Sequence, residues 1–143
     1  MNLGNVYRRK GELDKALECL NQALELQPDD PEIYYSLGMF YAQQSQMQRA
    51  SEYLQKAIDL RPDYAEALNN LGVLLVREHE YAKAETQFET CIRIAPNFDQ
   101  SYVNLARLYA MQGDKVKARE PLQKLLQLQP QNAAAKQVME MLQ

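Results

Sequence analysis

Apolar residues in the centre of the chain recur at intervals of three and four, the spacing that places side chains on one face of an α-helix. A first series is Leu68, Leu71 and Leu75. A second series is Tyr81, Ala84, Phe88, Cys91 and Ile92. The polar residues Glu78-His79-Glu80 lie between the two series and leave room only for a short turn. The pattern therefore predicts two antiparallel helices joined by a tight connection.

The same pattern repeats along the chain with a period of 34 residues and without insertion or deletion. Three ladders share this period: Gly4, Gly38, Gly72 and Ala106; Ala16, Ala50, Ala84 and Ala118; Pro28, Pro62, Pro96 and Pro130. A fixed period of roughly 20–50 residues is typical of repeat architectures. Leu3-Gly4 matches Leu37-Gly38, so residues equivalent to 31–34 are missing from the first copy, and we interpret the chain as a fragment.

Glycine inside the first helix of each pair needs a physical reason, because it costs about 1 kcal/mol relative to alanine there. We expect that Gly38 and Gly72 let the first helix lie close against the second, where Ala50 and Ala84 offer equally small surfaces. The prolines of the third ladder then end the second helix and turn the chain into the next unit.

These units resemble tetratricopeptide repeats. The signature of that family is an aromatic-x₂-Leu-Gly-x₂-Tyr segment, then Ala-x₃-Phe, then Pro. It appears here as Tyr34-x₂-Leu37-Gly38-x₂-Tyr41, Ala50-x₃-Leu54 and Pro62, again as Leu68, Leu71, Gly72, Leu75, Ala84, Phe88 and Pro96, and again as Tyr102, Leu105, Ala106, Tyr109, Ala118, Leu122 and Pro130. The resemblance covers essentially the whole chain and implies an all-α fold, a right-handed superhelical solenoid of antiparallel helix pairs.

The period divides the chain into parts of one solenoid over residues 1–143. These are a truncated first repeat at 1–30, further repeats at 31–64, 65–98 and 99–132, and a C-terminal capping helix at 133–143. In the first repeat we expect a helix over residues 1–9, a turn at Gly11-Glu12, and a second helix over Leu13–Leu26. In the last repeat Pro121 lies inside the helix expected over Lys115–Gln129. A kink or a late helix start, on the outer face away from the core, is therefore expected there.

The charge balance of the chain excludes some classes of partner. With 16 basic and 19 acidic residues the net charge is −3, which provides no general field for nucleic acid or an acidic membrane. No apolar run approaches the ~20 residues that span a bilayer, and we assign the chain to the cytoplasm by default. The run Arg8-Arg9-Lys10 is interpreted as a solvated helix end. Cys19 and Cys91 lie two repeats apart, on the order of 20 Å, so reduced thiols are expected.

No arrangement of residues suggests catalysis, a metal site or a cofactor. The one histidine, His79, lies between two glutamates in a turn and lacks the ligand number of a zinc site, so it is interpreted as an exposed turn residue. Scattered carboxylates such as Glu85 are interpreted as solvated. We expect a chain that is not an enzyme.

In the family's superhelix the first helix of each pair lines the concave side, so the face of these helices that is opposite the core contacts is the candidate binding groove. Its residues are Asn5, Arg8, Arg9, Tyr35, Met39, Asn69, Asn70, Val73, Arg77, Val103, Asn104 and Arg107. Carboxamides suit the backbone of an extended peptide, and the arginines favour an acidic or carboxylate-bearing ligand. The valines at 73 and 103 fit equally well with packing between neighbouring first helices.

Three functions are consistent with this pattern. The first is a non-catalytic interaction module that binds an extended peptide or a helix of a partner protein in its groove. The second is a structural role, in which the uncapped N-terminal edge stacks on another copy to give a homo-oligomer, or on the missing upstream repeats, and the groove is idle. The third is the substrate-presenting arm of a larger enzyme. Light scattering separates the second function from the first.

One type of ligand is disfavoured by the resemblance. Chaperone-binding members of the family hold a C-terminal carboxylate with lysine and asparagine on one helix, asparagine on the next, and lysine and arginine on a third. The matching places here are Tyr35 and Met39, then Asn70, then Gln100 and Asn104, so only Asn70 agrees.

We therefore predict that an acidic chaperone-tail peptide does not bind through this clamp, because the cations that would hold its carboxylate are absent from the matching places. Isothermal titration calorimetry with such a peptide should show no micromolar complex. A micromolar dissociation constant would contradict the prediction.

Overall fold

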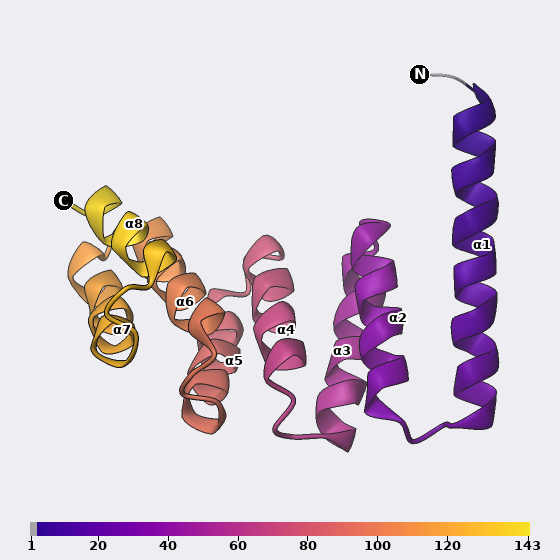
Figure 1. Ribbon diagram of the computed structural model, residues 1–143, viewed down its shortest axis with the longest axis horizontal. Coiled ribbons are helices and arrows are strands. Elements are labelled where there is room, and N and C mark those ends of the chain that lie inside the picture. The colour runs from indigo at the N-terminus through magenta and orange to yellow at the C-terminus, as the bar shows by residue number, and fades with distance from the viewer. Residues whose placement is uncertain (1–2) are drawn as a thin grey trace. The chain divides into compact units, whose positions relative to one another are not determined.

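The computed structural model describes residues 3–143, with side chains from residue 9 onward, and this part of the chain is helical without strands (Figure 1). The helices are α1 (Leu3–Leu26), α2 (Pro31–Gln43), α3 (Met47–Leu60), α4 (Ala65–Arg77), α5 (Tyr81–Ile94), α6 (Asp99–Met111), α7 (Lys115–Leu128) and α8 (Ala133–Met141). The all-α class predicted from the sequence is confirmed. The contacts divide the chain into two units, Met1–Pro62 with α1 to α3 and Asp63–Gln143 with α4 to α8.

The helix boundaries recur with the period of the sequence. Helices α2, α4, α6 and α8 begin at residues 31, 65, 99 and 133, and α3, α5 and α7 begin at residues 47, 81 and 115. Each short turn contains one residue with positive φ at the same position of the period: Ser45 (φ 60°), His79 (φ 62°) and Gly113 (φ 85°). This left-handed conformation reverses the chain. The tight connection predicted at Glu78-His79-Glu80 is confirmed, with His79 exposed, and it recurs at Ser45 and Gly113.

The first repeat departs from the prediction. Residues 3–26 form one continuous helix, so the turn expected at Gly11-Glu12 and the separate helix over Leu13–Leu26 are wrong, and Arg9 lies inside a helix rather than at its end. Gly11 has the sequence position of the turn residues, but a turn is favoured only when the returning helix finds a packing surface. Where no such surface is available, continuing the helical hydrogen-bond ladder is favoured.

In the first unit, α2 packs against α3 along its length, and Figure 1 shows the two helices side by side. Helix α2 begins at Pro31 because the Asp30 carboxylate accepts the N–H of Glu32 (2.9 Å) and proline suits the first turn of a helix. The core of the pair is made by Tyr34, Leu37, Tyr41, Ala50, Leu54 and Ala57, all buried.

In the second unit, α4 pairs with α5 and α6 pairs with α7, while α5 contacts α6 and α7 contacts α8. The core residues are Leu68, Leu71, Leu75, Ala84, Phe88, Cys91, Tyr102, Leu105, Ala106, Tyr109, Ala118, Leu122 and Leu125. Cys91 is a fully buried free thiol, as predicted, and its Sγ–H donates to the carbonyl of Ala65 at 3.4 Å. Cys19 in α1 is an exposed free thiol.

The paired helices approach most closely at glycine. A Cβ added to Gly38 would lie 2.8 Å from Leu54 Cγ, and one added to Gly72 would lie 2.5 Å from Phe88 Cε1. The expected close approach is confirmed, but the surface that meets the glycine is not that of Ala50 or Ala84. The larger side chain one turn beyond each alanine reaches across and occupies the space that a Cβ would need.

Pro121 also differs from the prediction. Helix α7 begins at Lys115 and contains Pro121 in its interior, so a late helix start is wrong. The residue is buried rather than on an outer face. It faces a hollow between α5 and α7, because its position on α7 turns toward the aromatic residues of α6 rather than away from them.

We predict that Gly72→Ala lowers the free energy of unfolding by about 1–3 kcal/mol, because the added methyl group overpacks the Phe88 ring more than the gain in helix propensity offsets. Gly11→Ala is the matched control. Gly11 is also inside a helix, but its Cβ would meet nothing within 4 Å. The control should raise stability by about 0.5–1 kcal/mol. Urea unfolding measures both, and a stabilising Gly72→Ala would contradict the packing argument.

Candidate functional site

Helices α4 and α6 enclose two adjoining hollows in the second unit. The first, of about 340 Å³, is lined by Asn69, Asn70, Val73, Asp99, Gln100, Val103, Asn104, Arg107 and Ala134. The second, of about 190 Å³, is lined by Val73, Val76, Arg77, Phe88, Asn104, Arg107, Leu108 and Met111. The hollows share Val73, Asn104 and Arg107, so they form one continuous surface, which we call the α4/α6 groove. Seven of the twelve candidate residues line it.

Asn69 forms the polar floor of the groove and joins α4 to α6. Its Oδ1 accepts hydrogen bonds from Ser101 Oγ (3.1 Å) and Asn104 Nδ2 (3.0 Å), and its Nδ2 lies 3.5 Å from Gln100 Oε1. The side chain is only 3% exposed, and Ser101 is fully buried. Asn69 was expected on the open face of the groove. Its carboxamide is instead used within the protein, because a buried amide must satisfy its own donors and acceptors.

The valines of the groove divide between packing and exposure. Val103 is 5% exposed and packs in the interior between the helices, whereas Val73 and Val76 are half-buried at the groove surface. Met111, at one end of the second hollow, is 62% exposed. The second hollow is therefore apolar, with a floor of Phe88 and Leu108 and an accessible wall of valine and methionine.

Arg77 from α4 and Arg107 from α6 both line this apolar hollow, and both are exposed. Neither forms an ion pair within the part of the chain that the structure describes. The carboxylate that lines the first hollow, Asp99, accepts a hydrogen bond from Asn132 Nδ2 (2.9 Å). Two guanidinium groups that have no ion-pair partner among the described side chains thus line an apolar recess, which is a suitable arrangement for a carboxylate group.

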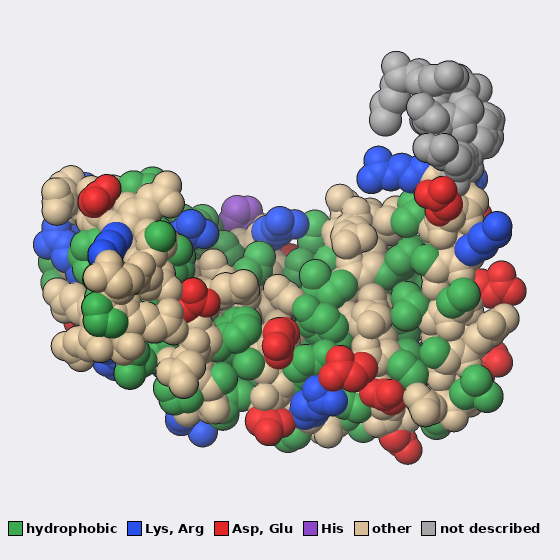
Figure 2. All heavy atoms as spheres, in the orientation of Figure 1, with side chains coloured by type: hydrophobic (Ala, Val, Ile, Leu, Met, Phe, Trp, Pro, Cys, Tyr) green, Lys and Arg blue, Asp and Glu red, His purple; other side chains and the backbone are tan. Residues whose placement is uncertain are grey.

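This local positive charge is not part of a broad basic surface. Over the described residues of the face drawn in Figure 2, acidic and basic side chains are interspersed with hydrophobic ones. The whole chain carries a net charge of −3.

The remaining candidate residues lie in the first unit. Tyr35 and Met39 are half-buried residues of α2, and Arg9 is exposed on α1. Asn5 and Arg8 lie outside the residues whose side chains are described. The contribution of these five residues to a binding surface stays a prediction.

The residues that could support other chemistry do not gather into a metal-binding cluster within the described part of the chain. His79 is exposed, and its Nδ1 is hydrogen-bonded to the Tyr81 hydroxyl at 2.8 Å. Within the described residues, no three histidine, cysteine or acidic side chains lie close enough together to hold a metal ion. Over the same residues, none of the helices is both long and apolar enough to cross a membrane.

Comparison with known families identifies the repeat. A TPR repeat family model matches residues 4–45, and two tetratricopeptide repeat models match residues 29–97 and 75–142. The chain belongs to the tetratricopeptide repeat family. A search of curated proteins finds no match.

Solved tetratricopeptide structures resemble this chain over almost its full length. MamA is 26% identical, with a TM-score of 0.80 over 99% of this chain and 83% of its own. YrrB, described as a TPR protein with an unusual peptide-binding site, is 28% identical, with a TM-score of 0.77 over 96% of this chain and 71% of its own. PilF of Pseudomonas aeruginosa, at 23% identity, has a TM-score of 0.81 over 98% of this chain and 64% of its own, and shares the fold.

Tetratricopeptide repeats are protein-interaction scaffolds and are generally non-catalytic, and this chain has that scaffold. The face predicted from the repeat includes seven residues that line the α4/α6 groove. It did not include Ser101, whose hydroxyl fixes Asn69, or Leu108 and Phe88, which form the apolar floor. Ser101 lies three residues before Asn104 on the same helix, and this spacing is the signal that could have revealed the shared partner.

We predict that Asn69→Ala lowers the free energy of unfolding by about 1–3 kcal/mol, because it leaves the buried hydroxyl of Ser101 without its acceptor. In a double-mutant cycle with Ser101→Ala the effects should be non-additive by at least about 0.5 kcal/mol. The control cycle pairs Asn69→Ala with Thr86→Ala, whose hydroxyl bonds to its own helix at Ala82, and should be additive. Additive effects of Asn69→Ala and Ser101→Ala would refute a stabilising hydrogen bond between these two side chains.

Proposed function

We propose that the α4/α6 groove binds an extended, acidic peptide segment of a partner protein. The observation that carries this proposal is the pair of guanidinium groups, Arg77 and Arg107, which line one apolar recess and form no ion pairs among the described residues. Exposed apolar surface in a recess, rimmed by unpaired charge, is the usual composition of a binding site rather than of a solvated face.

The two hollows suit two parts of one ligand. The recess lined by Val73, Val76 and Met111 accepts an aliphatic or aromatic side chain, and an acidic residue beside that side chain reaches Arg77 or Arg107. Arginine favours carboxylates because its planar fork can donate two parallel hydrogen bonds. The predicted ligand therefore carries an apolar residue next to aspartate or glutamate.

The first hollow supplies the contacts to the peptide backbone. Asn104 donates one amide hydrogen to Asn69, and its Oδ1 accepts no hydrogen bond within the described part of the chain. That oxygen is available to a peptide N–H, while Gln100 at the same hollow is exposed and can donate to a carbonyl. Contacts of this kind bind an extended chain irrespective of its side chains.

Asn69 strengthens this proposal although it does not itself face a ligand. By holding Ser101 and Asn104 it fixes the two walls of the groove in one orientation before a peptide arrives. A groove that is already ordered loses less conformational entropy on binding, so more of the contact energy appears as affinity.

The proposal is tested by selecting peptides from a random phage-displayed library against the wild-type chain and measuring the affinity of the selected sequences by calorimetry. We expect enrichment of sequences with adjacent apolar and acidic residues. Binding should weaken as salt is raised, because exposed charges are screened over about 8–10 Å at physiological ionic strength.

In the variant Arg77→Glu with Arg107→Glu the affinity should fall at least tenfold, about 1.4 kcal/mol, because two attractions become repulsions. Lys15→Glu with Lys115→Glu is the matched control. It changes the net charge equally at two exposed lysines outside the groove and should leave affinity unchanged. Equal losses in both variants, or no loss in the first, would overturn the proposal.

A further inference from the structure

Three tyrosines pack together on one side of the α2–α3 pair: Tyr34 and Tyr41 from α2, and Tyr53 from α3. The ring of Tyr53 stacks on that of Tyr41, with centroids 5.3 Å apart and an interplanar angle of 5°. It also lies beside Tyr34, with centroids 6.4 Å apart. The slot between the two tyrosines of α2 is therefore occupied by an aromatic ring from α3.

The α6–α7 pair contains the same two tyrosines, two periods of 34 residues later. Tyr102 corresponds to Tyr34, and each donates its hydroxyl to the carbonyl of an equivalent proline, Pro96 at 2.9 Å and Pro28 at 2.8 Å. Tyr109 corresponds to Tyr41. Like Tyr41, which has the Arg49 guanidinium 5.5 Å from its ring centroid, it has a cation over its ring, Lys117 Nζ at 4.2 Å. The two walls of the slot are thus reproduced.

The residue that fills the slot is not reproduced. The counterpart of Tyr53 is Pro121, whose ring is smaller than a phenol ring and which lines a hollow together with Tyr102 and Tyr109, themselves only 3% and 4% exposed. A hollow of about 400 Å³ remains there between α5, α6 and α7, which we call the aromatic slot. It is lined by Glu89, Ile92, Arg93, Tyr102, Leu105, Tyr109, Glu120, Pro121 and Lys124, and shares none of these residues with the α4/α6 groove.

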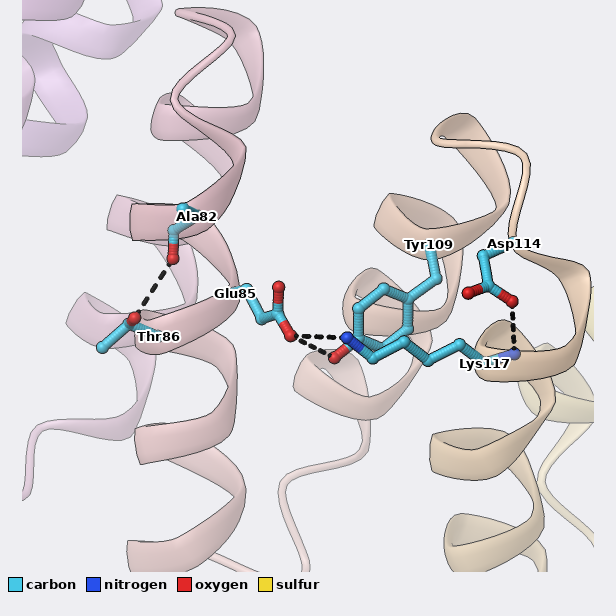
Figure 3. Close-up of polar contacts among 6 residues, drawn as sticks. All are labelled: Ala82, Glu85, Thr86, Tyr109, Asp114 and Lys117. Carbon is cyan, nitrogen blue, oxygen red and sulfur yellow. Dashed lines mark hydrogen bonds and ion pairs between the residues drawn. The ribbon is translucent and has the colours of Figure 1, made fainter.

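The wall made by Tyr109 is fixed in place by its polar neighbours (Figure 3). Its hydroxyl donates to Glu85 Oε1 at 2.6 Å, the same oxygen that accepts from Lys117 Nζ at 3.0 Å. Burial, together with the bond to the Glu85 carboxylate, raises the pKa of Tyr109 to about 12, so the donor keeps its proton. Asp114 fixes the start of α7 by accepting the N–H of Lys117. The interpretation of Glu85 as a solvated carboxylate is therefore wrong, because it has two partners in neighbouring helices.

Charged side chains of both signs surround the opening of the slot. Glu89 and Arg93 lie on α5, and Glu120 and Lys124 lie on α7, all of them exposed. Among the described residues none of the four takes part in an ion pair. Each is therefore able to pair with an opposite charge on an incoming chain.

We propose that the aromatic slot binds one tyrosine or phenylalanine side chain of a partner protein, presented between charged residues. The α2–α3 pair is the internal template, because there the same pair of tyrosines is completed by a tyrosine ring. The charges of Glu89, Arg93, Glu120 and Lys124 favour an occupant with acidic and basic neighbours over a purely apolar one. This site is separate from the α4/α6 groove and does not depend on the function proposed for it.

The probe is the tripeptide acetyl-Lys-Tyr-Glu-amide, titrated into the ¹⁵N-labelled chain and followed by two-dimensional NMR. We expect saturable shifts confined to residues around Ile92, Tyr102, Leu105 and Pro121. Acetyl-Lys-Ala-Glu-amide, which lacks the ring, should produce shifts at least tenfold smaller at equal concentration. Shifts of equal size with both peptides, or shifts spread over the chain, would overturn the proposal.

Two variants of Pro121 distinguish an effect of the open slot from an effect of the proline itself. Pro121→Tyr restores the residue of the template and should abolish the shifts, because the chain then fills its own slot. Pro121→Ala also removes the proline but leaves the space open, and it should bind the probe as the wild type does. Both variants should fold, because neither keeps a proline in a helix interior. Unchanged binding by Pro121→Tyr, or loss of binding in both, would refute the proposal.

Two further measurements fix the identity of the site and of its occupant. The Arg77→Glu, Arg107→Glu variant should bind the tripeptide as the wild type does, and loss of binding there would show that the probe occupies the α4/α6 groove instead. The free chain is also measured over a tenfold dilution. Shifts of the slot residues on dilution would identify a second copy of this chain as the occupant and overturn the assignment to a partner protein.

Discussion

The close contact between a glycine of one helix and a large side chain of the next sets the geometry of this molecule. At Gly72 the Phe88 ring occupies the place of a Cβ, and at Gly38 Leu54 does the same. Because the contact lies at the same step of the 34-residue period in both units, the helices of both pairs approach in the same way. One face of each paired helix is buried by this packing, so the opposite faces are the ones available to bind a partner.

The second unit uses its remaining faces in two different ways. The first helices, α4 and α6, meet through the buried amide of Asn69 and leave a groove that combines guanidinium groups with an apolar recess. The side lined by α5 and α7 carries a slot between fixed tyrosine rings. In the two proposals the groove combines guanidinium groups with an apolar recess, and the slot combines aromatic rings with charged residues at its opening. One packing scheme thus presents two separate candidate surfaces without new backbone geometry.

The period and the helical spacing of the apolar residues were sufficient to predict the pairs α2–α3, α4–α5 and α6–α7, because the same residue types recur at the same places in these three copies. Three features could not be obtained in this way. Gly11 has the sequence of a turn but lies in a helix, because turn formation depends on a packing partner that the pattern does not reveal. Asn69 was expected on the open face of the groove, but it is buried, because Ser101 in the next repeat donates a hydrogen bond to its side-chain oxygen. The slot beside Pro121 depends on side-chain size, and the pattern of apolar and polar positions does not reveal how well side chains of different size fill a space.

The connections at Ser45, His79 and Gly113 impose a condition on how such a chain can vary in length. A helix turns by about 100° with each residue. Within a helix that runs into one of these connections, one residue more or fewer would therefore rotate the apolar residues beyond it by over a quarter of a revolution and carry them away from the neighbouring helix. Growth by complete modules of 34 residues keeps the spacing of the helix starts and so restores the rotational phase.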